Sequence, residues 1–334
     1  MPTTSHDDVV LVLGGTGAVG RSVTSMLVGA GVRVLAAARR PPAALPAGAR
    51  FHLLDARDEA ALRAAVRVAP VVVDASGLDN GAVAAAAVAA GAQLVDLSAD
   101  TTHLTAVRRL DGAARAGQVT VLAGGGLAPG LTNLLAAAAH TLQPATAGIA
   151  LHVLLGLGER HGPAATAWML DQLAAPPRHP PRRVELPAGF GRHTARWVDF
   201  AEQHALTRDL AIPVISRCAL DPPLLAAATA YGARVPGLRR ALAAAAPTAA
   251  RLTRREWWVA EARTTDGATA WATGRGQSYA SAVVATWAAH QLLERRLPPG
   301  VHDLHHITDL DTLTPWLHRR GIATATTTPH TYVQ

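Results

Sequence analysis

Lysine is missing from this sequence of 334 residues, so all 31 of its basic residues are arginines. Without lysine the chain cannot form the Schiff base of pyridoxal phosphate enzymes or aldolases, and it has no P-loop lysine. It also has no Tyr-x-x-x-Lys pair of the kind found in many dehydrogenases. These three kinds of site are therefore excluded.

Cysteine is almost absent as well, because Cys218 is the only one. A single cysteine allows no intramolecular disulfide and no zinc site built from cysteines. We interpret Cys218 as a small buried hydrophobic residue. The stretch HDLHH places His302 and His306 four residues apart, but the prolines before it predict a strand-like segment, and no third ligand is evident. We therefore predict no metal site.

The chain has no hydrophobic run long enough to span a bilayer, because polar residues interrupt its alanine-rich segments. Its first eight residues, MPTTSHDD, carry acidic residues where a signal peptide needs a basic segment. These features predict a soluble, cytoplasmic protein with no membrane partner.

The formal net charge of +7 raises the question of nucleic acid as a partner. The arginines are scattered among acidic residues and proline-rich loops, and the densest stretch, PPRHPPRR at 176–183, contains no aromatic residue. We interpret that stretch as a solvated loop and predict no nucleic-acid binding. Anionic small molecules fit the excess positive charge equally well.

A glycine-rich turn follows the first apolar run, 9–13, and precedes a helical pattern and a second strand at 32–37. It fits G-x-G-x-x-G, or G-x-x-G-x-x-G from one residue earlier. Both patterns let a pyrophosphate approach the backbone and the positive end of a helix. The alternative is a turn that only packs a helix on a sheet. We predict cofactor contacts from Gly14, Gly15, Thr16, Gly17, Ala18 and Val19.

Two arginines, Arg39 and Arg40, end the second strand. An NAD-binding unit usually has an acidic residue at this place, which holds the 2′-hydroxyl of the ribose. A guanidinium suits a 2′-phosphate instead. We therefore predict NADP(H) as the cofactor, the alternative being two solvated arginines at the start of a loop.

Strand and helix patterns alternate through the first 145 residues, which predicts a Rossmann fold, an α/β doubly wound parallel sheet. A second α+β domain on a mixed or antiparallel sheet is expected at 146–276, for substrate binding and dimerisation. We predict helices within 277–334 and a frayed tail at 324–334. These helices are candidates for packing against the first domain. The six predicted strands of the first domain are 9–13, 32–38, 50–54, 70–74, 92–97 and 119–123.

Ligands of such sheets bind beyond the carboxyl ends of the strands. Asp55 and Ala56 follow the third strand and are candidates for the adenine edge, although Asp55 is equally suited to cap the next helix. We expect Ser76, Gly77 and Ser98 beside the nicotinamide, unless turn chemistry alone explains them. Gly125, in the run Gly124 to Gly126, lets a ligand or another backbone come close.

The best polar cluster of the second domain is Glu159-Arg160-His161-Gly162, where a strand ends before a helix. His161 is our candidate for moving a proton, and Arg160 for holding an anionic substrate group. A solvated turn is the alternative. If the cluster acts on a substrate, that substrate should lie near the 124–129 loop.

The segments LGGTGAVGR, VVVDASG, LVDLSAD and above all VTVLAGGGLAPGLTNLLA resemble the NADP-binding domain of saccharopine dehydrogenase-like proteins. The resemblance is strong over the first 140 residues and loose between 175 and 275. It implies a small-molecule substrate, NADP(H)-linked chemistry at an amine or imine carbon, and a homodimer formed through the substrate domain. A non-catalytic NADP sensor and a carbonyl or enoyl reductase remain alternatives.

Overall fold

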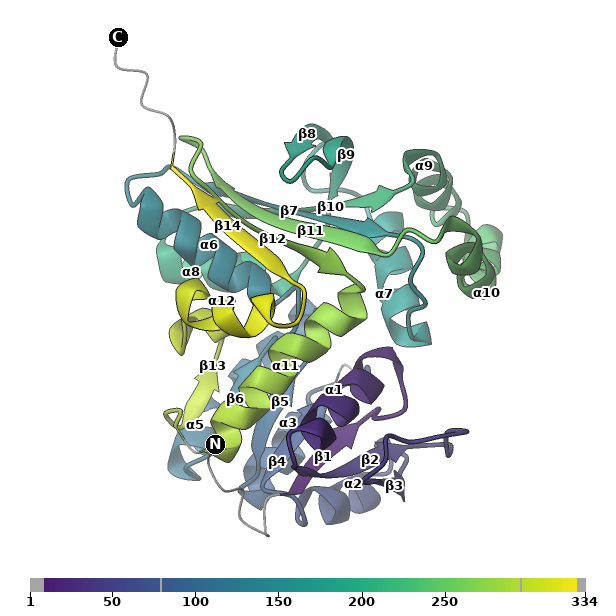
Figure 1. Ribbon diagram of the computed structural model, residues 1–334, viewed down its shortest axis with the longest axis vertical. Helices are drawn as coiled ribbons and strands as arrows, with labels where there is room; N and C mark the ends of the chain where they lie inside the picture. Colours follow the sequence, from purple (N-terminus) through teal and green to yellow (C-terminus); the bar gives the residue numbers. More distant parts are fainter. Residues whose placement is uncertain (1–8, 79, 295, 329–334) are drawn as a thin grey trace. The chain divides into compact units, whose positions relative to one another are not determined.

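The computed structural model describes residues 9–78, 80–294 and 296–328. Its contacts divide the chain into two units, residues 1–131 with 281–307 and residues 132–280 with 308–334. Each unit is built around one seven-stranded sheet (Figure 1). The predicted domain limits at 145 and 276 stay predictions, and the stretch MPTTSHDD lies outside the described residues.

The first sheet is entirely parallel, in the order β13-β6-β5-β4-β1-β2-β3. The order 3-2-1-4-5-6 of its first six strands is that of the Rossmann fold, as predicted. Buried Val, Leu and Ala residues dominate the central strands because both faces of a parallel sheet are covered. Its strands are β1 (Val9–Leu13), β2 (Arg33–Ala38), β3 (Ala49–Leu53), β4 (Val71–Asp74), β5 (Gln93–Asp96), β6 (Thr120–Ala123) and β13 (Gly300–His302).

Helices of the first unit begin at local capping signals. Before the helix Glu59–Val66, the Asp58 carboxylate accepts the backbone N–H groups of Ala60 and Ala61. Before the helix Thr101–Arg108, the Asp100 carboxylate accepts the N–H of His103. The helices are α1 (Ala18–Gly29), α2 (Glu59–Val66), α3 (Ala82–Ala90), α4 (Thr101–Arg108), α5 (Asp111–Ala116), the 3₁₀ helix η1 (Leu304–His306) and, shared with the second unit, α11 (Gln277–Leu293).

The second sheet is mixed, in the order β14-β12-β11-β7-β10-β9-β8. β7 and β10 pair in parallel, whereas the other pairs are antiparallel. The turn containing Asp266 and Gly267 joins β11 and β12 as an antiparallel hairpin. The strands are β7 (Ile149–Gly156), β8 (Arg182–Leu186), β9 (Gly191–Trp197), β10 (Val214–Asp221), β11 (Trp257–Thr264), β12 (Thr269–Arg275) and β14 (Ala323–Thr327).

Figure 1 shows α6, α8 and α12 on one face of this sheet and the β8–β9 hairpin at the other. Leu186 and Ala195 of the hairpin pack on Leu154, Ala219 and Val259 of the sheet. A further group of helices, α7, α9 and α10, packs together. The helices are α6 (Leu131–Leu142), α7 (Pro163–Ala174), α8 (Ala201–Leu210), α9 (Pro223–Gly232), α10 (Pro236–Thr253) and α12 (Leu310–His318).

Three predictions from local pattern need correction. The basic stretch 176–183 is not a loop throughout, because Arg182 and Arg183 belong to β8 and pair with β9. The tail predicted as frayed forms β14 as far as Thr327, because its backbone pairs with β12. The predicted strand over HDLHH ends at His302, and η1 follows. In each case pairing or capping elsewhere in the fold overrides weak local preference.

None of the helices in the described part of the chain is long and apolar enough to cross a membrane.

Candidate functional site

Packing accounts for three glycines of the glycine-rich turn. A Cβ on Gly14, whose φ is +69°, would lie 2.4 Å from the carbonyl oxygen of Ala75. A Cβ on Gly15 would lie 2.9 Å from the Cα of Ala36 in β2, and one on Gly20 only 2.3 Å from the Gly14 oxygen. Backbone atoms cannot give way at these distances, so these glycines let α1 and β4 approach the turn.

Gly17 is different. It precedes α1 with a φ of −76° that any residue adopts, and its side chain would meet only the Gly14 oxygen, at 3.2 Å. Gly17 and Ala18 are exposed, while Thr16 and Val19 are half-buried. The start of α1 carries no side-chain cap, so its N–H groups face outward with the positive end of the helix dipole. A contact of Gly17 with a bound phosphate stays a prediction.

The two arginines after β2, Arg39 and Arg40, are exposed. Asp55 beyond β3 is held by Arg57, whose Nε lies 2.9 Å from Oδ1 of Asp55. Hydrogen bonds from the Arg57 side chain and backbone, with a smaller contribution from the charge of Arg39, lower the pKa of Asp55 to about 2. Arg39 is thus within electrostatic reach of the third strand's end.

The interpretation of Asp55 as a helix cap is wrong. The cap of α2 is Asp58, because Asp58 directly precedes the helix whereas Asp55 lies four residues before its first residue. The expected contact of Asp55 and Ala56 with an adenine stays a prediction.

Matching turns follow β4 and β5. The N–H of Ser76 donates to Oδ1 of Asp74 at 2.9 Å, and the N–H of Ser98 donates to Oδ1 of Asp96 at 2.8 Å. Each serine oxygen then accepts a backbone N–H two residues later, at 3.2 Å in both turns. Turn chemistry therefore accounts for both serines, and Gly77 has the positive φ of +72° that such a turn favours. Their place beside a nicotinamide stays a prediction.

Beneath these turns lies a buried cluster of three titratable residues, Asp74, Asp96 and His103. The two aspartates are neighbours across β4 and β5, and Nε2 of His103 lies 2.7 Å from Oδ2 of Asp96. The N–H of Gly81 donates to Nδ1 of His103 at 3.2 Å. The neutral imidazole therefore carries its proton on Nε2 and donates it to Asp96.

Burial, followed by the charge of Asp96, raises the pKa of Asp74 to about 6. Burial disfavours a charged His103, but the hydrogen bond and charge of Asp96 outweigh it, so the pKa of His103 is also raised. Our sequence reasoning missed this cluster. The signal was present, because both strands end in an aspartate two residues before a serine, in VVVDAS and LVDLS.

Gly125 is also required by packing. Its Cβ would lie 2.6 Å from Cγ1 of Val95, and its N–H donates to the Asp96 carbonyl at 2.8 Å. Gly130 has a φ of +128°, and a Cβ there would lie 2.1 Å from the Gly126 oxygen. The glycines of this loop thus close it on itself and hold it against β5. A role of Gly125 toward the cofactor stays a prediction.

In the second unit, Glu159 and His161 meet the start of α11. The Glu159 carboxylate accepts the N–H groups of Gln277 and Ser278 at 2.5 and 2.9 Å. Nε2 of His161 lies 2.6 Å from Nε2 of Gln277, so the imidazole accepts the amide proton. Burial lowers the pKa of His161, against the charge of Glu159. His161 is therefore a neutral acceptor, whereas Arg160 is exposed.

Sequence reasoning included Glu159 in the polar cluster but did not predict its contact with the start of α11. The segments it joins are 118 residues apart, and no local pattern links them. The carboxylate complements the N-terminal dipole of a 17-residue helix. It thereby fixes the turn that carries His161.

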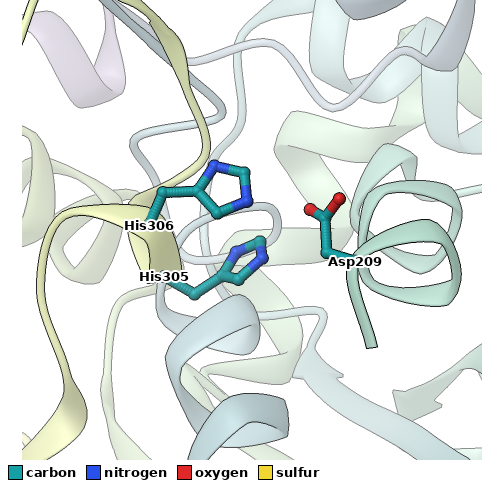
Figure 2. Close-up of side chains that lie close together, drawn as sticks. All are labelled: Asp209, His305 and His306. Atoms are coloured by element: carbon teal, nitrogen blue, oxygen red, sulfur yellow. The ribbon is translucent and has the colours of Figure 1, made fainter. Parts of the chain in front are cut away.

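The histidines considered as metal ligands lie on β13 and η1. His302 donates from Nε2 to the Pro298 carbonyl at 3.1 Å, and Nδ1 of His306 accepts the N–H of Asp303 at 3.3 Å. Figure 2 shows the rings of His305 and His306 next to each other, with centroids 4.2 Å apart. Asp209, also labelled there, belongs to the other unit, and the absence of a metal stays a prediction.

The comparisons with known proteins agree with this geometry. Residues 10–122 match the model of the saccharopine dehydrogenase NADP binding domain. No protein among those with curated function matches the chain. The apo saccharopine dehydrogenase (L-Glu forming) of Saccharomyces cerevisiae is similar in structure at 13% identity and a TM-score of 0.61, over 96% of this chain and 100% of that one. This similarity shows the fold.

Other matched structures cover about a third of the chain. A Rossmann-fold NAD(P)-binding family protein of Shigella flexneri shares 22% identity over 35% of this chain and 66% of that one, with a TM-score of 0.27. Serine dehydrogenase of Escherichia coli shares 17% sequence identity over 34% of this chain and 79% of that one, with a TM-score of 0.29. Residues 10–122 belong to the saccharopine dehydrogenase NADP-binding domain family, and this domain supports NADP(H) as the cofactor and NADP-dependent oxidoreductase as the enzyme class.

Proposed function

We propose that this protein uses NADP(H) to reduce the C=N bond of an imine, or to oxidise the matching secondary amine, in a small molecule. The observation that carries the proposal is the match of residues 10–122 to an NADP-binding domain of the saccharopine dehydrogenase family. Gly17, which is exposed, and the exposed Arg39 and Arg40 fit that cofactor.

The cofactor, when bound, supplies or accepts the hydride. A protonated imine is already an electrophile, so the protein has to orient the reactants more than it has to supply acid or base. A chain without lysine suits such a reaction. The start of α1 would hold the pyrophosphate, and Arg39 with Arg40 the 2′-phosphate.

His161 is the proton carrier in this proposal. Burial keeps its imidazole neutral, and the hydrogen bond with Gln277 orients the ring. The exposed Arg160 next to it would hold an anionic group of the substrate. We also propose a homodimer through the second unit, which light scattering during gel filtration would test.

We expect His161→Ala to lower kcat with little change in NADPH affinity, because His161 acts on the substrate. Arg160→Ala should mainly raise KM, because it removes binding common to the ground and transition states. The assay follows NADPH consumption with oxo acids and aldehydes mixed with amines and amino acids. If both variants match the wild type on the substrate found, this cluster is not the site.

The same assay separates the alternatives. Tight NADPH binding without turnover on any mixture would indicate a sensor. Turnover of carbonyl compounds in the absence of amines would indicate a carbonyl or enoyl reductase. Either result would contradict the proposed reaction and leave the NADP-binding domain unaffected.

Cofactor preference gives a second test. We expect NADPH to bind at least about tenfold more tightly than NADH, because a charge-assisted hydrogen bond contributes about 1.5 to 3 kcal/mol. Arg39→Ala should remove this preference and leave NADH affinity unchanged. Arg63→Ala, which removes an exposed charge elsewhere in the unit, is the matched control. Fluorescence titration of both cofactors measures the ratio, and an unchanged ratio in Arg39→Ala would refute the role of this arginine.

A further inference from the structure

A row of four large side chains crosses the second sheet. In the pairing register, Trp197 of β9 lies opposite Arg217 of β10, which lies opposite His152 of β7, which lies opposite Glu261 of β11. Residues directly opposite each other share a face of a sheet. All four side chains are buried, and Arg217 is only 4% exposed.

Both oxygens of Glu261, the one carboxylate in this row, already have partners. Oε2 of Glu261 lies 3.1 Å from Nδ1 of His152, and Oε1 accepts Nη2 of Arg263 at 2.6 Å. Nη2 of Arg263 also donates to the Glu185 carbonyl of β8 at 2.9 Å, which ties the β8–β9 hairpin to this face. Glu261 is thus engaged by His152 and Arg263 and makes no hydrogen bond with Arg217.

Arg217 has no hydrogen-bond or ion-pair partner among the residues that the structure describes, and its Nε is buried without one. The charged group that acts on it is another cation, Arg182 of β8. Burial, and then the charge of Arg182, lower the pKa of Arg217. Buried charges in folded proteins are paired, because an unpaired one keeps its full desolvation penalty. No residue in the described part of the chain supplies a counter-charge for Arg217.

A cavity of about 310 Å³ opens beside Trp197 in the same unit. Its lining includes Arg178, His179, Trp197, His204 and Arg208, and no acidic residue lines it. Arg208 and His204 form ion pairs with Asp209 and Asp199.

Arg178, in contrast, stacks over Trp197 at 5.6 Å from the ring centroid and has no carboxylate partner in the described chain. The cavity is at the small end of the range for small-molecule sites.

We propose that this part of the second unit binds a small oxyanion, a carboxylate or phosphate group, with Arg217 as its anchor and Arg178 and Arg182 beside it. The planar guanidinium of Arg217 can hold such a group through two parallel hydrogen bonds. The basic stretch 176–183, which the cofactor site does not use, supplies the other two arginines. The site is separate from the NADP-binding turn and does not rest on the proposed reaction.

A small anion fits better than an acidic side chain of another protein. Arg217 is only 4% exposed, so a protein surface cannot reach it. Arg217 does not line the cavity itself, but the strand register places it opposite Trp197, which does. The proposal therefore concerns a dissolved ligand.

Inorganic phosphate and citrate are suitable probes, with the ionic strength held constant by sodium chloride. In the wild type, each is expected to raise Tm and change the fluorescence of Trp197 with a saturable concentration dependence. The Trp197→Phe variant should lose the fluorescence change. Arg217→Met should lose both responses while its Tm in chloride alone is no lower than that of the wild type, because an unpaired buried charge has been removed.

Arg178→Gln, a loop substitution, should weaken the apparent affinity at least about tenfold. The matched control is Arg192→Gln on β9, because Arg192 is exposed and already paired with Glu185. The control should keep the wild-type affinity.

Three results would overturn the proposal. The first is a wild type that does not respond to either probe beyond chloride. The second is an equal loss in Arg192→Gln, which would indicate general electrostatic screening. The third is a marked fall in the Tm of Arg217→Met without any anion, which would make Arg217 a structural residue.

Discussion

Replacing Gly17 with valine is expected to lower the affinity for NADPH at least about a hundredfold while the protein stays folded. The backbone at Gly17 adopts an ordinary φ of −76°, and a Cβ there meets one atom, the Gly14 oxygen, at 3.2 Å, a tight contact that a shift of a few tenths of an ångström relieves. A branched side chain would occupy the space through which a pyrophosphate reaches the first N–H groups of α1. Circular dichroism together with a fluorescence titration of NADPH measures both parts of the prediction.

Two other glycines of the same helix provide controls. Gly29→Val lies near the other end of α1, where a Cβ meets nothing within 4 Å, so neither folding nor binding should change. Gly20→Val should destabilise the unit, because its Cβ would lie 2.3 Å from the Gly14 oxygen. If Gly17→Val kept the affinity of Gly29→Val, the glycines of the turn would serve packing alone.

Substituting Asp74 with asparagine is expected to change how the stability of the protein depends on pH. The pKa of Asp74 is raised from 3.8 to about 6 by burial and by the charge of Asp96. Between these two values the folded state holds a proton that the unfolded state has released. The stabilising effect of that proton is fully present below about pH 4 and is lost as the pH rises through 6.

The size of the effect follows from the shift of roughly two pKa units at about 1.4 kcal/mol per unit, which gives about 3 kcal/mol. Asparagine cannot ionise, yet its side-chain oxygen can still accept the N–H of Ser76. Relative to the wild type, Asp74→Asn should therefore gain up to about 3 kcal/mol in free energy of unfolding between pH 4 and pH 7. Urea denaturation at several pH values measures the difference.

The exposed Asp266, in the turn between β11 and β12, provides the control substitution Asp266→Asn. That variant should follow the wild type at every pH. A constant difference between Asp74→Asn and the wild type across this range would mean that Asp74 titrates normally, and that Asp96 and His103 do not act on it.

Local pattern was sufficient for the first six strands of the first sheet. All six strands predicted between 9 and 123 lie within one residue of those observed, because short apolar runs and the glycines and polar residues between them mark their limits. The turn at Gly17 and the arginines after β2 were also readable, since their chemistry needs residues that are adjacent in the chain. The cofactor follows from these local features.

Tertiary structure alone decided the remaining features. Asp74, Asp96 and His103 meet because parallel pairing places two strand ends side by side, and Glu159 reaches Gln277 across 118 residues. β8 and β14 are strands only because β9 and β12 pair with them. Whether a charged residue such as Arg217 is paired depends on which strands are neighbours, since burial and pairing arise from non-local contacts that residue spacing does not encode.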